Sequence, residues 1–244
     1  MDVFAMVKER FDLAFILEIF PKLLHAFPAT LEMAVLAALF GWGFGLLIAF
    51  GKVNGSKLFR SVIHFITVIL RGVPEIVLLY LVYFGLPKLM EDLFGVSLRD
   101  WSKMSFIVLA LALRVAMTSS EMFRSAYNSM DKGQLEAAHA LGMTRWQRFR
   151  RIIFPQSAFV ILPNLTSASL SLIQATSFAY TLSVLDVMYR ARTINANIQS
   201  TRSLESYIAV AVIYWVFSFV VIQIFKLLER RLGHGMRTVA TASD

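Results

Sequence analysis

The 244-residue chain contains no cysteine, which excludes disulfide bonds, thiolate metal sites and cysteine nucleophiles. Acidic residues are also scarce, with 16 Asp and Glu against 24 Lys and Arg, so the formal net charge is +8. The few histidines are scattered, without an HExxH motif: His25, His64, His139 and His234. We therefore expect no enzyme active site within the membrane.

Two glycine-containing stretches resemble nucleotide-binding motifs but lack what those motifs need. Gly41, Gly43 and Gly45 follow no strand, so close packing between membrane helices explains them better. Between Gly45 and the next glycine lie five residues where a P-loop has four, and Val53 stands where a P-loop has Ser or Thr. We predict that the chain itself binds no ATP.

Apolar residues dominate what is present. Hydrophobic residues make up 57% of the chain, 21 residues are Phe, and the mean hydropathy is +0.65. Such a composition predicts an all-α polytopic membrane protein. In that class a basic excess arises from Lys and Arg in cytoplasmic loops, and the hydropathy argues against nucleic acid as a partner.

We predict about five spans, each a run of roughly 20 apolar residues. They cover residues 28–50, 61–86, 104–123, 158–178 and 207–228. The predicted organisation is an N-terminal segment (1–27), a transmembrane domain (28–228) that contains a cytoplasmic loop (131–157), and a cytoplasmic basic tail (229–244).

The N-terminal segment is apolar but charged, and Pro21 breaks its apolar run, so we expect an interfacial helix. We expect no cleavable signal peptide, because charged residues precede an apolar stretch without a small-residue cleavage site. Basic residues are more numerous on the inner side if the N-terminus lies outside. Lys52, Lys57 and Arg60 then mark a short cytoplasmic turn, and the 131–157 loop lies inside.

Charged residues interrupt two of the spans. Arg71 and Glu75 flank a Gly/Pro break in the second, which indicates either a kink bridged by these two residues or a broken helix at a translocation path. Arg114 lies in the third span, where a central Arg costs about 2.5–3.5 kcal/mol and needs an acceptor. That acceptor is either Glu75 or Glu121 in a salt bridge, or a substrate carboxylate. Further candidate substrate contacts are Thr118, Gln174, Thr176 and Ser177.

The longest polar interruption is EAAHALGMTRWQRFRRIIFP, from Glu136 to Pro155. Glu136, Ala137 and Ala138 open a helix, Gly142 turns the chain, and a second short helix leads to Pro155. Glu136 has the chemistry to cap or to pair, and Gly142 permits a turn that a Cβ would obstruct. A helix, a turn and a helix suit a rigid plug presented to a partner.

The spacing in this stretch resembles the EAA loop of ABC-importer permeases. Glu-Ala-Ala, three residues, Gly, nine residues, Ile, one residue, an apolar residue and Pro follow in order, with Phe154 where the family usually has Leu. Further likeness to the polar amino acid (histidine/glutamine-type) permeases lies in 71–74, 121–124, 130–134 and 163–164. Arg114 departs from the family's usual Asn, Gln174-Ala175 from its Lys-Asp, and Val73 from its Thr.

The resemblance implies the transmembrane domain of a type I ABC importer in the bacterial cytoplasmic membrane. It implies an external or periplasmic solute-binding protein, a second or sister permease, and a cytoplasmic ATPase dimer that carries ATP and Mg. In this family the EAA loop, here Glu136, Ala137, Ala138, Gly142 and Pro155, docks on the ATPase. The basic run that includes Arg145 and Arg148 would meet acidic groups there or lipid headgroups.

The alternative is an ion-coupled secondary transporter or a channel-like subunit. It predicts an internal repeat of spans and coupling-ion carboxylates within the membrane. No convincing repeat is present, and the acidic candidates within the spans are Glu32, Glu75 and Glu121.

Overall fold

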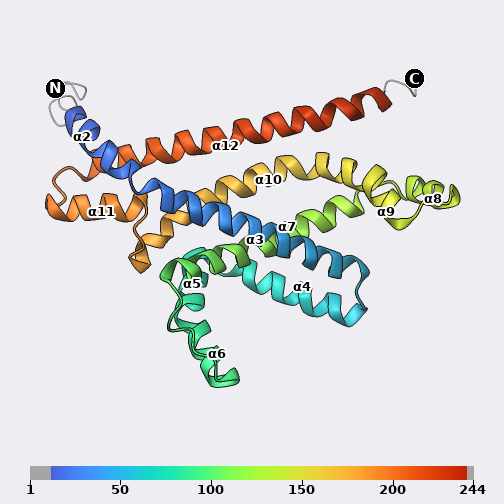
Figure 1. Cartoon of the computed structure of the whole chain (residues 1–244), viewed down its shortest axis with the longest axis horizontal. Helices are drawn as coiled ribbons and strands as arrows, with labels where there is room; N and C mark the ends of the chain where they lie inside the picture. Colours follow the sequence, from blue (N-terminus) through green and yellow to red (C-terminus); the bar gives the residue numbers. More distant parts are fainter. Residues whose placement is uncertain (1–11, 241–244) are drawn as a thin grey trace, which may run out of the picture.

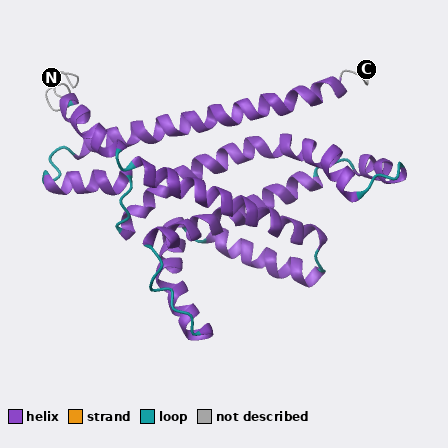
Figure 2. Cartoon of the chain, viewed as in Figure 1, coloured by secondary structure: helices purple, strands orange, loops and turns teal. Residues whose placement is uncertain are grey.

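A computed structural model describes residues 12–240, and within this range the chain forms helices and loops without strands (Figure 2). Four helical runs are long and apolar enough to cross a membrane: α3 (Phe27–Asn54), α7 (Lys103–Asn128), Arg145–Leu182 with α10 (Phe154–Thr176) at its centre, and Ser203–Arg231 within α12 (Ser203–Ala240). A bent pair makes a fifth if it counts as one span. The predicted all-α fold with about five spans is confirmed.

The core is the contact between α3 and α7, which run side by side through the middle of the molecule (Figure 1). Gly41 and Gly45 allow this approach, because a Cβ at Gly41 would lie 2.5 Å from Val115 and one at Gly45 would overlap the hydroxyl of Ser119. Small residues let membrane helices approach closely, as the sequence indicated for these two positions. Gly43 faces open space and has no such role.

The bent pair begins with α4 (Lys57–Gly72) and continues as α5 (Glu75–Tyr80), η1 (Leu81–Gly85) and α6 (Leu86–Phe94), with a bend of 109° at the break. Val73 is extended because it precedes Pro74, and a residue before proline is driven out of the α region. The α6 end therefore projects sideways from the bundle (Figure 1). A broken helix in the second span is confirmed.

At one end of the molecule α2 (Leu13–Leu24) and α11 (Val187–Asn197) pack on α12 around a second apolar cluster. Pro21 interrupts the apolar run in the sequence, but it lies inside α2 and does not end the helix. The α12 helix runs on to Ala240, past the predicted end of the fifth span at 228. Residues 1–11 of the predicted N-terminal segment and 241–244 of the predicted tail lie outside the described residues.

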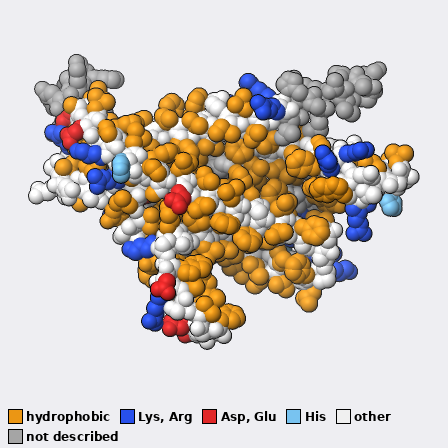
Figure 3. Space-filling model, viewed as in Figure 1, with side chains coloured by type: hydrophobic (Ala, Val, Ile, Leu, Met, Phe, Trp, Pro, Cys, Tyr) orange, Lys and Arg blue, Asp and Glu red, His pale blue; other side chains and the backbone are white. Residues whose placement is uncertain are grey.

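The middle of the molecule differs in composition from its ends. The turn between α3 and α4 lies at the same end as the loop from α8 (Lys132–Ala140) through α9 (Arg145–Arg148) to η2 (Phe149–Ile153) (Figure 1). Orange apolar side chains cover most of the middle in Figure 3, whereas Lys and Arg lie mainly toward the ends. This is the distribution that a lipid-facing belt between two aqueous surfaces requires. Both segments predicted to be cytoplasmic share one end.

Candidate functional site: a charged cavity and a protruding loop

A cavity of about 280 Å³ opens beside the break between α4 and α5. It is lined by Arg71, Glu75, Leu111, Arg114, Val115, Thr118, Ala168, Ser171, Leu172 and Ala175. The size is near the lower end of the roughly 300–1,000 Å³ typical of small-molecule sites. Helices α7 and α10 supply its apolar wall, and the broken span supplies two charged side chains.

Arg114 reaches from α7 to the end of α4. Its Nη1 donates to the carbonyls of Arg71 (2.7 Å), Leu70 (3.2 Å) and Val73 (3.5 Å), and its Nε lies 3.7 Å from Oε1 of Glu75. A cation is stabilised at a helix C-terminus, and a carboxylate in the first turn of a helix is stabilised likewise. Arg114 therefore neutralises the negative end of α4, and Glu75 sits at the positive end of α5.

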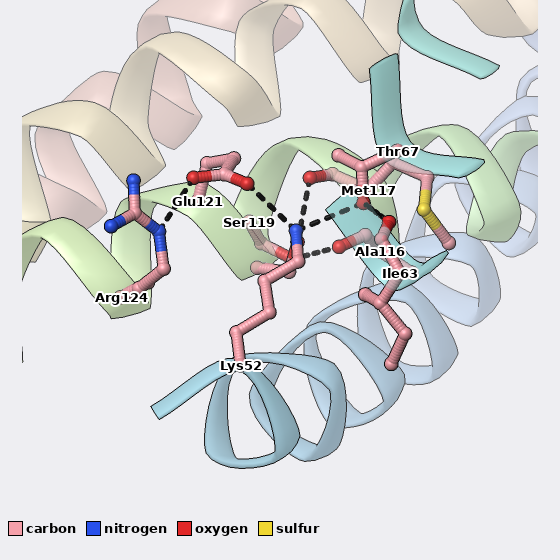
Figure 4. A network of polar contacts seen from close by, with 9 residues as sticks. Lys52, Ile63, Thr67, Ala116, Met117, Ser119, Glu121 and Arg124 are labelled. Atoms are coloured by element: carbon pink, nitrogen blue, oxygen red, sulfur yellow. Dashed lines mark hydrogen bonds and ion pairs between the residues drawn. The ribbon is translucent and has the colours of Figure 1, made fainter. Parts of the chain in front are cut away.

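These contacts decide between the predicted alternatives for the ion pairs. The expected bridge between Arg71 and Glu75 is wrong, because Glu75 pairs with Arg114 instead. Glu121 does not pair with Arg114 but with Lys52 (2.7 Å) and Arg124 (2.9 Å) (Figure 4). Lys52 was expected in a cytoplasmic turn, but it is buried within α3. The sequence could not show this, because a lysine near the end of an apolar run looks the same in either place.

Several polar atoms in the cavity remain without a hydrogen bond to any of the side chains that the structure describes, those of residues 12–131 and 133–231, or to the described backbone. The Arg71 side chain makes no hydrogen bond or ion pair there, and neither Nη2 of Arg114 nor Oε2 of Glu75 has a hydrogen-bond partner. From the sequence, Arg71 was placed at the break in the second span but was not among the candidate substrate contacts, although it lines this cavity. Its position directly before the Gly/Pro break was the available signal. The cavity thus offers two cationic donors and one carboxylate within one small volume.

Of the other predicted substrate contacts, one lines the cavity and three do not. Thr118 lines the cavity and donates to the carbonyl of Arg114 (3.1 Å). Gln174, Thr176 and Ser177 are not in the lining, and Thr176 is fully buried with its hydroxyl bonded to Ile173. The face of α10 toward the cavity carries residues three, four and seven apart: Ala168, Ser171, Leu172 and Ala175. The predicted trio falls outside that row, and its substrate role stays untested.

The predicted helix, glycine turn and helix all form. Gly142 follows α8 with a φ of +73°, a left-handed conformation that L-residues rarely adopt. A Cβ at Gly142 would meet no atom within 4 Å, so the backbone conformation, rather than obstruction, is what requires glycine. Asp131, not Glu136, caps α8 by accepting from the Gly133 N–H (2.8 Å). Glu136 is exposed and has no partner among the described residues.

The loop ends in an apolar tip. Leu141 is 81% exposed and Trp146 66% exposed, and Trp146 stacks on Phe149 with ring centroids 5.6 Å apart. Ala137 is exposed as well, whereas Ala138 is buried. A capping box at Thr144 and Gln147 starts α9, and Pro155 lies in the first turn of α10 as predicted. Apolar side chains fixed on a short rigid motif are typical of a docking surface.

Comparison with known proteins assigns the family. Residues 41–234 match the family described as "Binding-protein-dependent transport system inner membrane component". The chain belongs to this family. It is an inner-membrane component of a bacterial ABC transport system, as the EAA loop predicted, and nothing in the comparisons supports a secondary transporter. Among the side chains that the structure describes, no three His, Asp or Glu are grouped to hold a metal ion.

Individual relatives cover nearly the whole chain. A probable amino-acid permease protein YxeN of Bacillus subtilis is 34% identical over 93% of this chain and 98% of its own length. The L-cystine transport system permease protein TcyL of the same organism is 30% identical, with 98% of each chain covered. A crystal structure of an amino acid ABC transporter with histidines superposes with a TM-score of 0.76 at 28% identity, covering 91% of this chain and 99% of that one. The predicted type I importer fold is confirmed.

Proposed function

We propose that this chain is the permease subunit of an ATP-driven importer of polar amino acids, and that the cavity at the α4–α5 break binds the amino acid. The observation that carries the proposal is the juxtaposition of free cationic and anionic groups in one small cavity: Arg71, Nη2 of Arg114, and Oε2 of Glu75. An amino acid is a zwitterion. Its carboxylate matches the guanidinium groups and its ammonium matches the carboxylate.

The two arginines have different roles in this proposal. Arg114 holds the end of α4 with Nη1 and turns only its remaining donors toward substrate. Arg71 has no partner among the residues whose side chains are described (12–131 and 133–231), so its whole guanidinium fork is available for a bidentate pair with a carboxylate. Thr118 and Ser171 add hydroxyl groups for a polar side chain. The relatives named for amino-acid and L-cystine transport support an amino-acid substrate.

The exposed tip of the loop favours a partner ATPase. The exposed tip around Leu141 and Trp146 lies on the same end as the α3–α4 turn, the end predicted to be cytoplasmic. We infer that it docks on a cytoplasmic ATPase dimer, where ATP and Mg are bound, and that a solute-binding protein delivers the amino acid at the opposite end. A second copy of the chain or a sister permease completes the pathway.

Uptake by the native transporter tests the cavity. Cells that lack this chain are complemented with the wild type, with Arg71→Gln, or with Arg99→Gln, and uptake of labelled amino acids is measured by competition. Arg99 is the matched control, because its exposed guanidinium pairs with Glu91 outside the cavity. Arg71→Gln removes a charge-assisted hydrogen bond of roughly 1.5–3 kcal/mol. The substrate concentration that gives half-maximal uptake should therefore rise about tenfold or more in this variant. Equal behaviour of the two variants contradicts this assignment.

The absence of cysteine makes the docking test direct. Leu141→Cys introduces the chain's single thiol at the loop tip, and a heterobifunctional cross-linker should join it to the ATPase in native membranes. Phe94→Cys is the control, because Phe94 is also largely exposed (67%) but lies on α6, and it should give no ATPase adduct. Recovery of no ATPase from either variant would remove the basis for an ATP-driven importer.

A further inference from the structure

A single buried cation joins three helices. Lys52 lies in the last turn of α3 and is only 6% exposed. Its Nζ contacts Oε1 of Glu121 (2.7 Å), Oγ1 of Thr67 (2.9 Å) and Oγ of Ser120 (3.0 Å), as Figure 4 shows for the labelled partners. An ammonium group has three N–H donors, and here each has its own acceptor.

The partners of Lys52 are themselves held in place. The Thr67 hydroxyl donates to the carbonyl of Ile63 (2.7 Å), and the Ser120 hydroxyl donates to that of Met117 (2.9 Å), so each turns a lone pair toward the ammonium. The second oxygen of Glu121 accepts from Arg124. A buried polar network in which every member is satisfied specifies one arrangement of its helices.

This network matters most for α4, because α4 has little apolar contact with the bundle. Thr67 is its single buried residue, Leu70 is partly buried against the core, and side chains such as Phe65 are largely exposed. Apart from the Phe59 ring, which lies against Gly51 and Gly55 at the end of α3, two polar contacts hold α4 to its neighbours. One is Lys52 on Thr67, and the other is Arg114 on the carbonyls one turn further along.

We propose that Lys52 is a positioning residue that makes α4 move together with α7. The α7 helix leads within a few residues into α8 and the apolar tip, and α4 ends in the cavity at Arg71. Movement of the loop thus reaches α7 directly and passes through the Lys52 contacts to α4 and the cavity. This inference rests on the proposed roles of the loop and the cavity.

A matched pair of variants separates positioning from simple stabilisation. Thr67→Val and Ser120→Ala each remove one buried hydroxyl acceptor of the same ammonium, but only Thr67→Val releases α4, because Ser120 belongs to α7 together with Glu121. Lys52→Met removes all three hydrogen bonds of the ammonium group at once. If Lys52→Met fails to fold, the pair still decides the question.

Two readouts are compared in the purified transporter. The first is the distance between spin labels at Phe65→Cys on α4 and Tyr127→Cys on α7, both accessible and the only thiols in the chain. The second is the number of substrate molecules imported per ATP hydrolysed in proteoliposomes with the loaded binding protein. We expect Thr67→Val to broaden the distribution of distances between the two labels. The number of substrate molecules imported per ATP should fall at least about tenfold, while ATP hydrolysis is retained. Ser120→Ala should stay near the wild type in both.

Three results would overturn the proposal: equal effects of Thr67→Val and Ser120→Ala, a parallel fall of import and hydrolysis, or an unchanged label distance in Thr67→Val. Failure of the proposed function looks different. No ATPase would then purify with the chain, while the label distances in the chain alone would still report whether Lys52 fixes α4.

Discussion

The close contact of α3 and α7 makes a sharp prediction about two glycines that look alike in the sequence. Gly41→Ala places a Cβ 2.5 Å from both Cβ and Cγ1 of Val115 and 3.0 Å from the carbonyl of Ala112. A normal carbon contact is about 3.5–4.0 Å, so the helices must separate by roughly 1 Å. Val115 cannot turn away, because the Cβ itself clashes and a β-branched side chain on a helix has one favoured rotamer. Gly43→Ala meets no atom within 4 Å.

The magnitude follows from two opposing effects. Replacing glycine by alanine within a helix gains about 0.5–1 kcal/mol, whereas overpacking a close contact costs about 1–3 kcal/mol. Gly43→Ala should therefore be neutral or slightly stabilising, and Gly41→Ala destabilising by up to about 2 kcal/mol. Gly45→Ala should fall between them, because the Ser119 hydroxyl it meets can rotate at the expense of its bond to the Val115 carbonyl.

Thermal unfolding in detergent, followed by the fluorescence of the four tryptophans, gives the ranking. Combining Gly41→Ala with Val115→Gly moves the missing Cβ to the other helix and should recover part of the lost stability. Equal melting temperatures for the Gly41 and Gly43 variants would refute the close approach of α3 and α7.

Three further predictions concern charge and backbone conformation. Burial raises the pKa of Asp186, outside the spans, from 3.8 to about 6. The folded state therefore binds this proton more tightly than the unfolded state does. As the pH falls from 7 to 5, the free energy of unfolding should rise by roughly 1 kcal/mol. Melting curves of Asp186→Asn should lack that rise. Gly142→Ala should lower the free energy of unfolding by about 1–2 kcal/mol, because alanine rarely adopts the positive φ at this position. Gly142→Asn should lower it less, because asparagine tolerates that conformation better, and the same thermal unfolding measures both variants. Arg114→Met should lower stability by roughly 2–3 kcal/mol by releasing the end of α4, whereas Arg71→Met should leave the melting temperature unchanged while uptake falls.

Much of the architecture was determined by local chemistry and could be predicted from the sequence. Runs of about 20 apolar residues have one stable form in lipid, the helix, because every backbone polar group must be satisfied internally. The break at Val73-Pro74 follows from proline sterics between neighbours in the chain. Gly142 and the short helices beside it form the predicted loop for similarly local reasons. Pro21 shows the limit, because its helix continues where packing on α11 and α12 supports it.

The pairing of charges was decided only by the tertiary structure. Arg71 and Glu75 are four residues apart and suggested a bridge on one helix, but the bend at the break separates their helices and Glu75 meets Arg114 from α7 instead. Lys52 looked like a loop residue, yet the close approach of α3 and α7 buries it on Glu121. Which cation meets which carboxylate depends on the distance and rotation between helices far apart in the chain. A single sequence fixes what each helix carries, and only the packing of the helices decides which side chains meet.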